Sequence, residues 1–309
     1  MVPLPSFPVA TTPTAAGQLP GATPYDHTAA PPSIDPLPGH GLEVKLASLH
    51  DGSRDGQLVV VSRDLSTAHH ATGIATRMRQ LLDDWNFVSP QLEDLYATLN
   101  GGKVRHAFAF DPRRAMAPLP RTGLYCVAAG AAPPLLQPGD ELLGPHDDVA
   151  IADDGWGLAA APALAVVSGD MAAGVAAAPA LDGVRLLMLV NAWTLRERPD
   201  AWPVAACGPV AVTPDELGAA WAGGRCHGTL ACHVDGQPVE APPAAEGAHF
   251  GRLLAQLAVA RRLRAGAVVA AARAPTAALR IGQRLRIEFI DADGQSPFGA
   301  IEQRVVAAH

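Results

Sequence analysis

The sequence predicts a β-rich α+β fold, in which many short strands are interspersed with a few helices. Hydrophobic residues make up 49% of the 309 residues, which is enough for a sizeable core. Aromatic residues are only 5%, so we expect that core to consist mainly of Leu, Val and Ala. Short apolar runs bounded by Gly, Pro and Asp recur along the chain, whereas apolar residues at helical spacing occur in few stretches.

Residues 1–41 differ in composition from the rest of the chain. They hold ten of the 29 prolines and no Lys or Arg, and their apolar residues follow neither strand nor helix spacing. Such a segment buries too little apolar surface to offset its ordering entropy. We therefore predict a disordered extension, with a partner-binding Pro-rich motif as the alternative.

Residues 42–120 are predicted to form a small α+β domain. The runs at 42–49 and 57–62 read as a β-hairpin, because Asp-Gly pairs suit the tight turn between them. A first helix should carry Ile74, Met78, Leu81 and Leu82. A second helix should begin with Ser89 as N-cap and Pro90 at its first position and end at Gly101.

Residues 121–309 are predicted to form a larger, β-rich domain. The stretch 213–216 reads as a capping box that opens a short helix, and Asp235-Gly236 reads as a hairpin turn. The clearest helix is predicted at 248–264 and ends before Gly266. The remaining predicted strands are 163–168, 186–191, 226–234, 238–240, 267–271, 284–291 and 298–306.

Composition also limits the partners and the compartment. The net charge of −7 argues against a nucleic-acid partner, since phosphate binding requires clustered Lys and Arg. The N-terminus lacks the basic and apolar regions of a signal peptide, and no clean apolar span of 18 residues follows. Four cysteines in a chain of this length do not indicate a disulfide framework. We expect a cytoplasmic protein that does not bind membranes.

Several stretches, in this order, resemble the bacterial fumarylacetoacetate hydrolase family. They are LEVKLASLHDGSRDGQLVVVSRDL, LDDWNFVSPQLEDLY, GPHDDV, SGDM, MLVNAWTLR, GPVAVTPDELGAAW and RLRIEFIDADGQSPFGAIEQRV, which together span about residues 42–309. The resemblance implies a small N-terminal domain before a β-rich catalytic domain, usually in a homodimer. It also implies Mg²⁺- or Ca²⁺-assisted C–C bond hydrolysis of a β-diketo acid, or related isomerase and decarboxylase reactions.

The metal ligands that the resemblance implies are missing from this chain. Family members use a Glu-x-Glu pair on one strand, whose side chains point to the same face and toward one ion. Here the two positions are Ala161 and Ala163, and the Asp of the family's Asn-Asp-Trp pattern is Ala192. The first Asp and the catalytic His have no counterpart before Asp140. We therefore predict no cofactor, with Mg²⁺ or Ca²⁺ not tightly bound.

The other catalytic positions are also altered. The family's substrate-polarising Lys corresponds best to Trp202, and no acid is available as partner of the His. Arg196 matches the family's Arg, where a guanidinium could recognise a carboxylate; a surface ion pair or packing on Trp193 is the alternative. A rebuilt pocket would draw on the following side chains: Trp193, Trp202, Cys207 and Tyr125.

The stretch CHGTLACH at residues 226–233 suggests a zinc site, but strand geometry opposes it. On one strand the two cysteines would lie about 20 Å apart, too far to share an ion. Only a loop conformation could bring them together.

Two functions remain open from the sequence. The first is a non-hydrolytic family member, a homodimer that binds a small anionic molecule or a partner, and for which we expect no enzyme activity. The second is a metal-independent enzyme of altered chemistry, such as a tautomerase, cyclase, decarboxylase or residual C–C hydrolase acting on a β-keto or β-diketo acid. A third reading, a decaying gene product, is consistent with the shortened loops.

Overall fold

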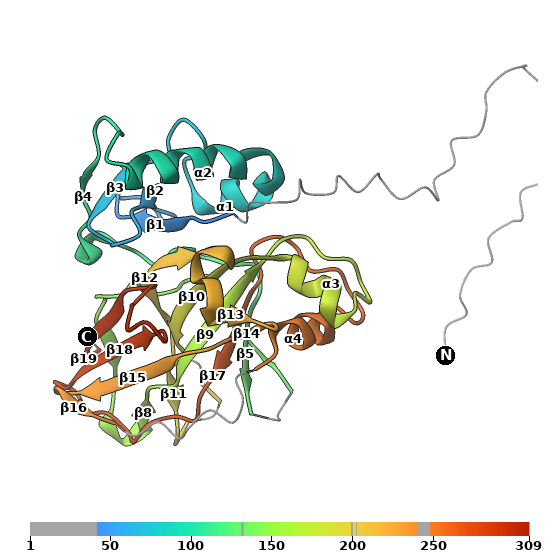
Figure 1. The fold of residues 1–309 in the computed structure, drawn as a ribbon. Helices are drawn as coiled ribbons and strands as arrows, with labels where there is room; N and C mark the ends of the chain where they lie inside the picture. Colours follow the sequence, from blue (N-terminus) through green and yellow to red (C-terminus); the bar gives the residue numbers. More distant parts are fainter. Residues whose placement is uncertain (1–41, 131–132, 199, 202, 240–247, 309) are drawn as a thin grey trace, which may run out of the picture. The chain divides into compact units, whose positions relative to one another are not determined.

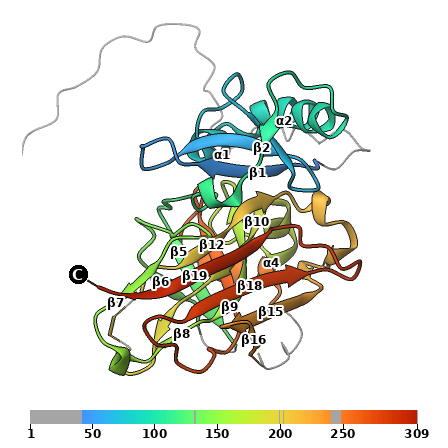
Figure 2. The ribbon, with the colours of Figure 1, turned by 90° about the vertical axis from the view of Figure 1, so that its left-hand side faces the viewer.

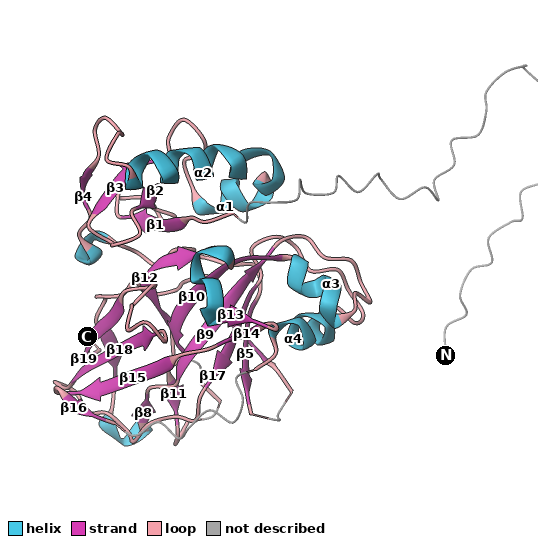
Figure 3. Cartoon of the chain, in the orientation of Figure 1, coloured by secondary structure: helices cyan, strands magenta, loops and turns pink. Residues whose placement is uncertain are grey.

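The computed structural model describes residues 42–130, 133–198, 200–201, 203–239 and 248–308, and β-strands dominate it (Figures 1 and 3). The extension predicted at 1–41 lies outside the described residues. The β-rich α+β class is confirmed. The boundary predicted between residues 120 and 121 stays a prediction.

The larger sheet has ten strands. They are β1 (Lys45–Leu49), β2 (Gln57–Val61), β3 (Thr67–His70), β4 (Phe108–Ala109), β5 (Tyr125–Ala129), β6 (Leu135–Gln137), β9 (Pro162–Ser168), β10 (Val184–Asn191), β12 (Ala206–Val212) and β17 (Val268–Ala272). Their order is β4-β3-β2-β1-β12-β10-β9-β17-β5-β6, and all neighbours are antiparallel except β17 and β5. Since β1 pairs with β12, the hairpin β1–β2 extends the sheet built by the later strands.

A second sheet of five strands lies on the other side of the core (Figure 2). It consists of β7 (Val149–Ile151), β15 (Thr229–Val234), β16 (Gln237–Pro238), β18 (Arg284–Ile290) and β19 (Ala300–Ala307), in the order β16-β15-β18-β19-β7. Asp235 and Gly236 have φ of 50° and 78°, so the hairpin turn between β15 and β16 is as predicted. Two small ladders pair β8 (Leu158–Ala159) with β11 (Thr194–Leu195) and β13 (Trp221–Ala222) with β14 (Arg225–Cys226).

Helices are few and short. The α-helices are α1 (Met78–Asp83), α2 (Trp85–Asn100), α3 (Ala177–Asp182) and α4 (Phe250–Leu257), and 3₁₀ turns cover Pro112–Arg114, Asp154–Trp156 and Asp215–Ala220. Within the described part of the chain, no helix has the length and apolar character needed to cross a bilayer.

Helix α2 begins earlier than predicted. It starts at Trp85 rather than at Pro90, so the N-cap predicted at Ser89 is wrong and Pro90 lies inside the helix. Trp85 and Val88 are both buried with Leu92, and this packing outweighs the one backbone hydrogen bond that the proline removes. The predicted end is confirmed, because Gly101 is the C-cap.

Helix α4 ends earlier than predicted. It stops at Leu257, whereas the apolar spacing extended the prediction to residue 264. Leu263 instead forms an antiparallel bridge with Met171, with N···O distances of 2.9 and 3.1 Å. Pairing with a distant strand segment therefore overrides helical spacing, and it directs the chain into β17.

The capping box predicted at 213–216 does not form. Oγ1 of Thr213 accepts a hydrogen bond from the backbone N–H of Val44 at 2.9 Å, and the following 3₁₀ helix has no side-chain cap. The Thr213 hydroxyl, which the sequence pattern predicted to cap the next helix, therefore bonds instead to Val44, just before β1.

The side chains of β10 divide between two buried cores. On β10, Leu186 and Met188 face a core shared with α1 and α2, which we call the helix-side core. Leu187 and Leu189 face the five-stranded sheet in what we call the inter-sheet core. Alternation along the strand explains the division, and it fixes the side of the sheet on which every neighbouring residue lies.

Candidate functional site

The positions that the family resemblance assigns to metal ligands lie close together in the structure. Ala163 on β9 is opposite Val190 on β10, and the backbone N–H of Ala192 donates to the carbonyl of Ala161 at 3.0 Å. Ala161, Ala163 and Ala192 all belong to the helix-side core, and we call them the three-alanine site. Their exposed fractions are 2%, 0% and 1%, so solvent does not reach them.

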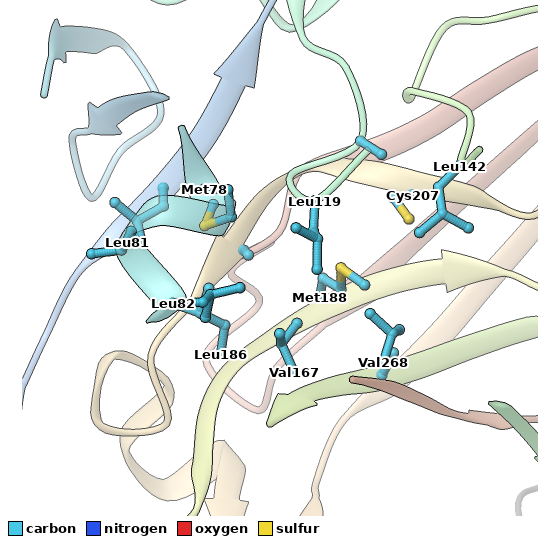
Figure 4. Packing of buried hydrophobic residues seen from close by; sticks show 14 of the residues in the cluster. Met78, Leu81, Leu82, Leu119, Leu142, Val167, Leu186, Met188, Cys207 and Val268 are labelled. Carbon is cyan, nitrogen blue, oxygen red and sulfur yellow. The ribbon is translucent and has the colours of Figure 1, made fainter. Parts of the chain in front are cut away.

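Two loop segments cover this face of the sheet. Leu119 lies over Met188 and Leu142 lies beside Cys207, as Figure 4 shows. Backbone bonds hold the second segment in place, because Leu143 donates to Ala205 at 2.8 Å and Cys207 donates to Leu143 at 2.9 Å. The face that carries the three alanines is therefore closed by apolar packing.

Asn191 is the one fully buried polar side chain beside the three-alanine site. Its Oδ1 accepts a hydrogen bond from the backbone N–H of Ala161 at 2.9 Å, and its exposed fraction is 0%. Its Nδ2 has no partner within the described residues. The amide therefore anchors the start of β9 and leaves one donor unsatisfied.

Tyr125 and Cys207, two of the predicted pocket residues, lie in the helix-side core. The Tyr125 hydroxyl is buried without a partner among the described residues, and burial raises its pKa well above the usual value. Burial also raises the pKa of the Cys207 thiol to about 12. Both groups are therefore neutral near pH 7, and Cys207 lacks the thiolate that a nucleophile needs.

Trp193 lies in a different core from Tyr125 and Cys207. It follows Ala192 on the extended chain and thus points to the opposite face, into the inter-sheet core. Its Nε1 donates to Oε1 of Gln303 at 3.1 Å, with both side chains buried. Trp202, also predicted for the pocket, lies outside the described residues.

Arg196 is exposed and follows the strand β11. Its Nη2 donates to the carbonyl oxygens of Pro275 (3.2 Å) and Thr276. Within the described part of the chain, no carboxylate lies at ion-pair distance from this guanidinium. Arg196 thus tethers the segment after β17, a role that neither reading of the sequence included.

The other side chains considered as metal ligands are either not grouped together or already hydrogen-bonded to the backbone. Across the described residues, no three His, Cys, Asp or Glu side chains are grouped closely enough to hold a metal ion. Cys226 is on β14, whereas Cys232 is on β15, a different strand. Among the acids, Asp153 and Asp154 accept backbone N–H bonds from Gly155 and Ile281 at 2.8 and 2.7 Å, so both stabilise turns.

Sequence reasoning missed the residues that cover the three-alanine site. Leu119 stands between two prolines, and Leu142 follows a Pro-Gly-Asp-Glu stretch. Neither leucine lies in a run with strand or helix spacing, so no local pattern indicated that they are buried. The signal available was only that the loops around them are shorter than in the family.

Comparisons with known proteins match almost all of the described chain. A family model described as fumarylacetoacetase N-terminal domain 2 matches residues 44–121, and one described as fumarylacetoacetate hydrolase C-terminal matches residues 128–306. The search of curated proteins gives no match.

Solved structures share the fold at low identity. A maleylpyruvate hydrolase from Sphingobium sp. SYK-6, in complex with manganese(II) and pyruvate, is 19% identical with a TM-score of 0.68, over 86% of this chain and 100% of that chain. A probable 2-hydroxyhepta-2,4-diene-1,7-dioate isomerase from Mycobacterium abscessus is 17% identical with a TM-score of 0.67, over 86% and 99%. A fumarylacetoacetate hydrolase from Exiguobacterium antarcticum is 15% identical with a TM-score of 0.64, over 86% and 100%.

Proposed function

Since this chain belongs to the fumarylacetoacetate hydrolase family, we propose that it is a non-hydrolytic member, a homodimer that binds a small anionic molecule or a partner. The observation that carries the proposal is the three-alanine site, which is buried in the same apolar core as Leu119 and Leu142. It offers methyl groups where the family resemblance implies carboxylates.

The side chains at this site do not fit a divalent cation. Mg²⁺ and Ca²⁺ take six or more oxygen ligands, usually with several carboxylates among them. Asn191 contributes one side-chain oxygen, and that oxygen already accepts the N–H of Ala161. Without the ion a family-type reaction loses the charge that stabilises its enolate-like transition state, which is worth several kcal/mol.

Metal binding by this chain can be tested directly, with the relative that was solved with manganese(II) and pyruvate as the reference. We expect titration calorimetry of the purified full chain with Mn²⁺, Mg²⁺ and Ca²⁺ to reveal no site tighter than about millimolar. A micromolar site of one ion per chain would contradict the proposal. The Sphingobium enzyme, titrated with Mn²⁺ under the same conditions, is the positive control.

A metal-independent enzyme is the alternative function, and the geometry gives it less support. Cys207 is a protonated, buried thiol, and Arg196 has one nitrogen engaged by backbone carbonyls. Turnover of acylpyruvates or oxaloacetate in the presence of EDTA, lost in Arg196→Ala, would favour this alternative over the binding protein. We expect no turnover by either form.

The homodimer is tested separately. Sedimentation of the purified chain should give twice the 31.9 kDa of one chain. A monomer at micromolar concentration would contradict this part of the proposal and leave the metal prediction unaffected.

A further inference from the structure

A charged hollow of about 710 Å³ lies on the five-stranded sheet, away from the three-alanine site. Strands β18 and β19 contribute its main residues, with His146 before β7 and His233 on β15 at its borders. In Figure 2 these strands face the viewer, and no described helix covers them. The volume is within the range of small-molecule sites.

Two arginines meet in this hollow, and among the described residues neither is within ion-pair distance of a carboxylate, although Asp148 and Glu302 also line the hollow. Arg284 on β18 is directly opposite Arg304 on β19 in the antiparallel register, which brings their Cα atoms within about 5.5 Å. Both side chains are exposed. Like charges in directly opposed positions destabilise a sheet. The pair therefore lowers the stability of the fold unless an anion is bound between the two guanidinium groups.

Two of the nearby acids, Glu302 and Asp235, already have partners, whereas Asp148 is a further carboxylate in the lining of the hollow. Glu302 pairs with Arg286, and Arg286 also pairs with Glu288 at 2.7 Å. Asp235, at the border of the hollow, accepts from Gln283 Nε2 and from the backbone N–H of Arg284, both at 2.9 Å. Across the described residues, Arg284 and Arg304 are thus left without an ion pair, although the whole chain carries a net charge of −7.

We propose that this hollow binds a small molecule through a phosphate group held between Arg284 and Arg304. Two guanidinium groups offer paired N–H donors that match the oxygens of a phosphate dianion. Gln303 is not a ligand, because both ends of its amide already bond to Trp193 and to the carbonyl of Asp147. The remaining volume accommodates the organic part of the ligand.

The proposal is tested on the full chain with inorganic phosphate as the probe, by ³¹P NMR titration at constant ionic strength. We expect saturable binding at one site per chain. Arg284→Gln and Arg304→Gln should each weaken it at least about tenfold, since each removes charge-assisted hydrogen bonds. Arg261→Gln, the same change at an exposed arginine on the loop after α4, should leave the affinity unaltered.

Thermal melting gives an independent readout. Phosphate should raise the Tm of the wild type, because a ligand that binds only the folded state stabilises it. It should not raise the Tm of the double variant Arg284→Gln/Arg304→Gln. Equal responses of the wild type and the double variant, or an equal loss of affinity in Arg261→Gln, would overturn the proposal. Saturable binding of succinate but not phosphate would also overturn it, in favour of a dicarboxylate site.

Discussion

Asn191 on β10 holds the first residue of the three-alanine site in place, because its buried Oδ1 accepts the backbone N–H of Ala161 at 2.9 Å. The same amide presents Nδ2 to a space where the described residues provide no acceptor. A buried polar residue is thus kept next to the three alanines, and its measurable role is structural.

Replacing Asn191 by Ala should therefore lower the free energy of unfolding by about 1–3 kcal/mol, the cost of leaving the buried N–H of Ala161 without an acceptor. Urea unfolding at neutral pH measures the change. Asn86→Ala, which alters an exposed asparagine on α2, is the matched control and should change stability by less than about 0.5 kcal/mol. Equal effects of the two substitutions would show that the Asn191 bond contributes nothing.

Ala163→Glu should destabilise the chain by more than about 3 kcal/mol, because it places a carboxyl group in a closed apolar core. We expect millimolar Mg²⁺ not to restore the lost stability. Melting curves with Mg²⁺ and with EDTA test this, and Ala150→Glu on the exposed side of β7 serves as control. Recovery of the Tm by Mg²⁺ would mean that the position still opens onto a metal site.

A buried ion pair connects β1 with the segment that follows β12. Lys45 Nζ lies 3.9 Å from Glu216 Oε1, and the two side chains are 5% and 2% exposed. Lys45 Nζ also donates to the carbonyl of Pro297 at 3.2 Å. Burial lowers the pKa of Lys45, and the charge of Glu216 opposes that shift. Glu216 also pairs with the exposed Arg63 at 3.1 Å, so its carboxylate serves two cations.

We predict that Glu216→Gln lowers the free energy of unfolding by about 3–5 kcal/mol, as expected when one partner of a buried pair is removed. Asp200→Asn is the control, since Asp200 is 67% exposed and pairs with Arg198, outside this network, and it should cost less than about 1 kcal/mol. In a double-mutant cycle with Lys45→Met, additive effects would refute the coupling.

Alkaline pH should destabilise the fold through its buried thiols. Burial raises the pKa of Cys126 to about 11 and that of Cys207 to about 12, from an ordinary value of 9.0. Above pH 9 the unfolded thiols lose protons that the folded thiols retain, so stability falls as the pH rises toward 11. Cys207→Ala should make this fall shallower, as denaturant unfolding at a series of pH values would reveal. An unchanged slope would contradict the assignment.

Local patterns predicted the elements that local physics controls. The Asp-Gly turns placed the hairpins β1–β2 and β15–β16 correctly, and Gly101 marked the end of α2. The errors at Thr213 and Leu263 have one cause, since each residue bonds to a segment far away in the chain. Spacing along the sequence carries no information about such partners.

The candidate site was predictable only in part. The location of the three alanines in one core was predictable, because strand alternation and the family resemblance together assigned their positions. The packing of Leu119 over Met188 could not be predicted, because the two residues are far apart in sequence. The separation of Trp193 from Cys207 follows from alternation beyond Ala192, and a strict count of strand faces would have identified it.

The burial of the three-alanine site also constrains how a metal ligand could arise there by mutation. A single acid introduced there enters a buried apolar core, so the first substitution destabilises the fold. The core around the three alanines would have to open before an acid there could bind a cation. The fold thus has the family's architecture, and its packing makes any single substitution toward a metal ligand at these positions destabilising.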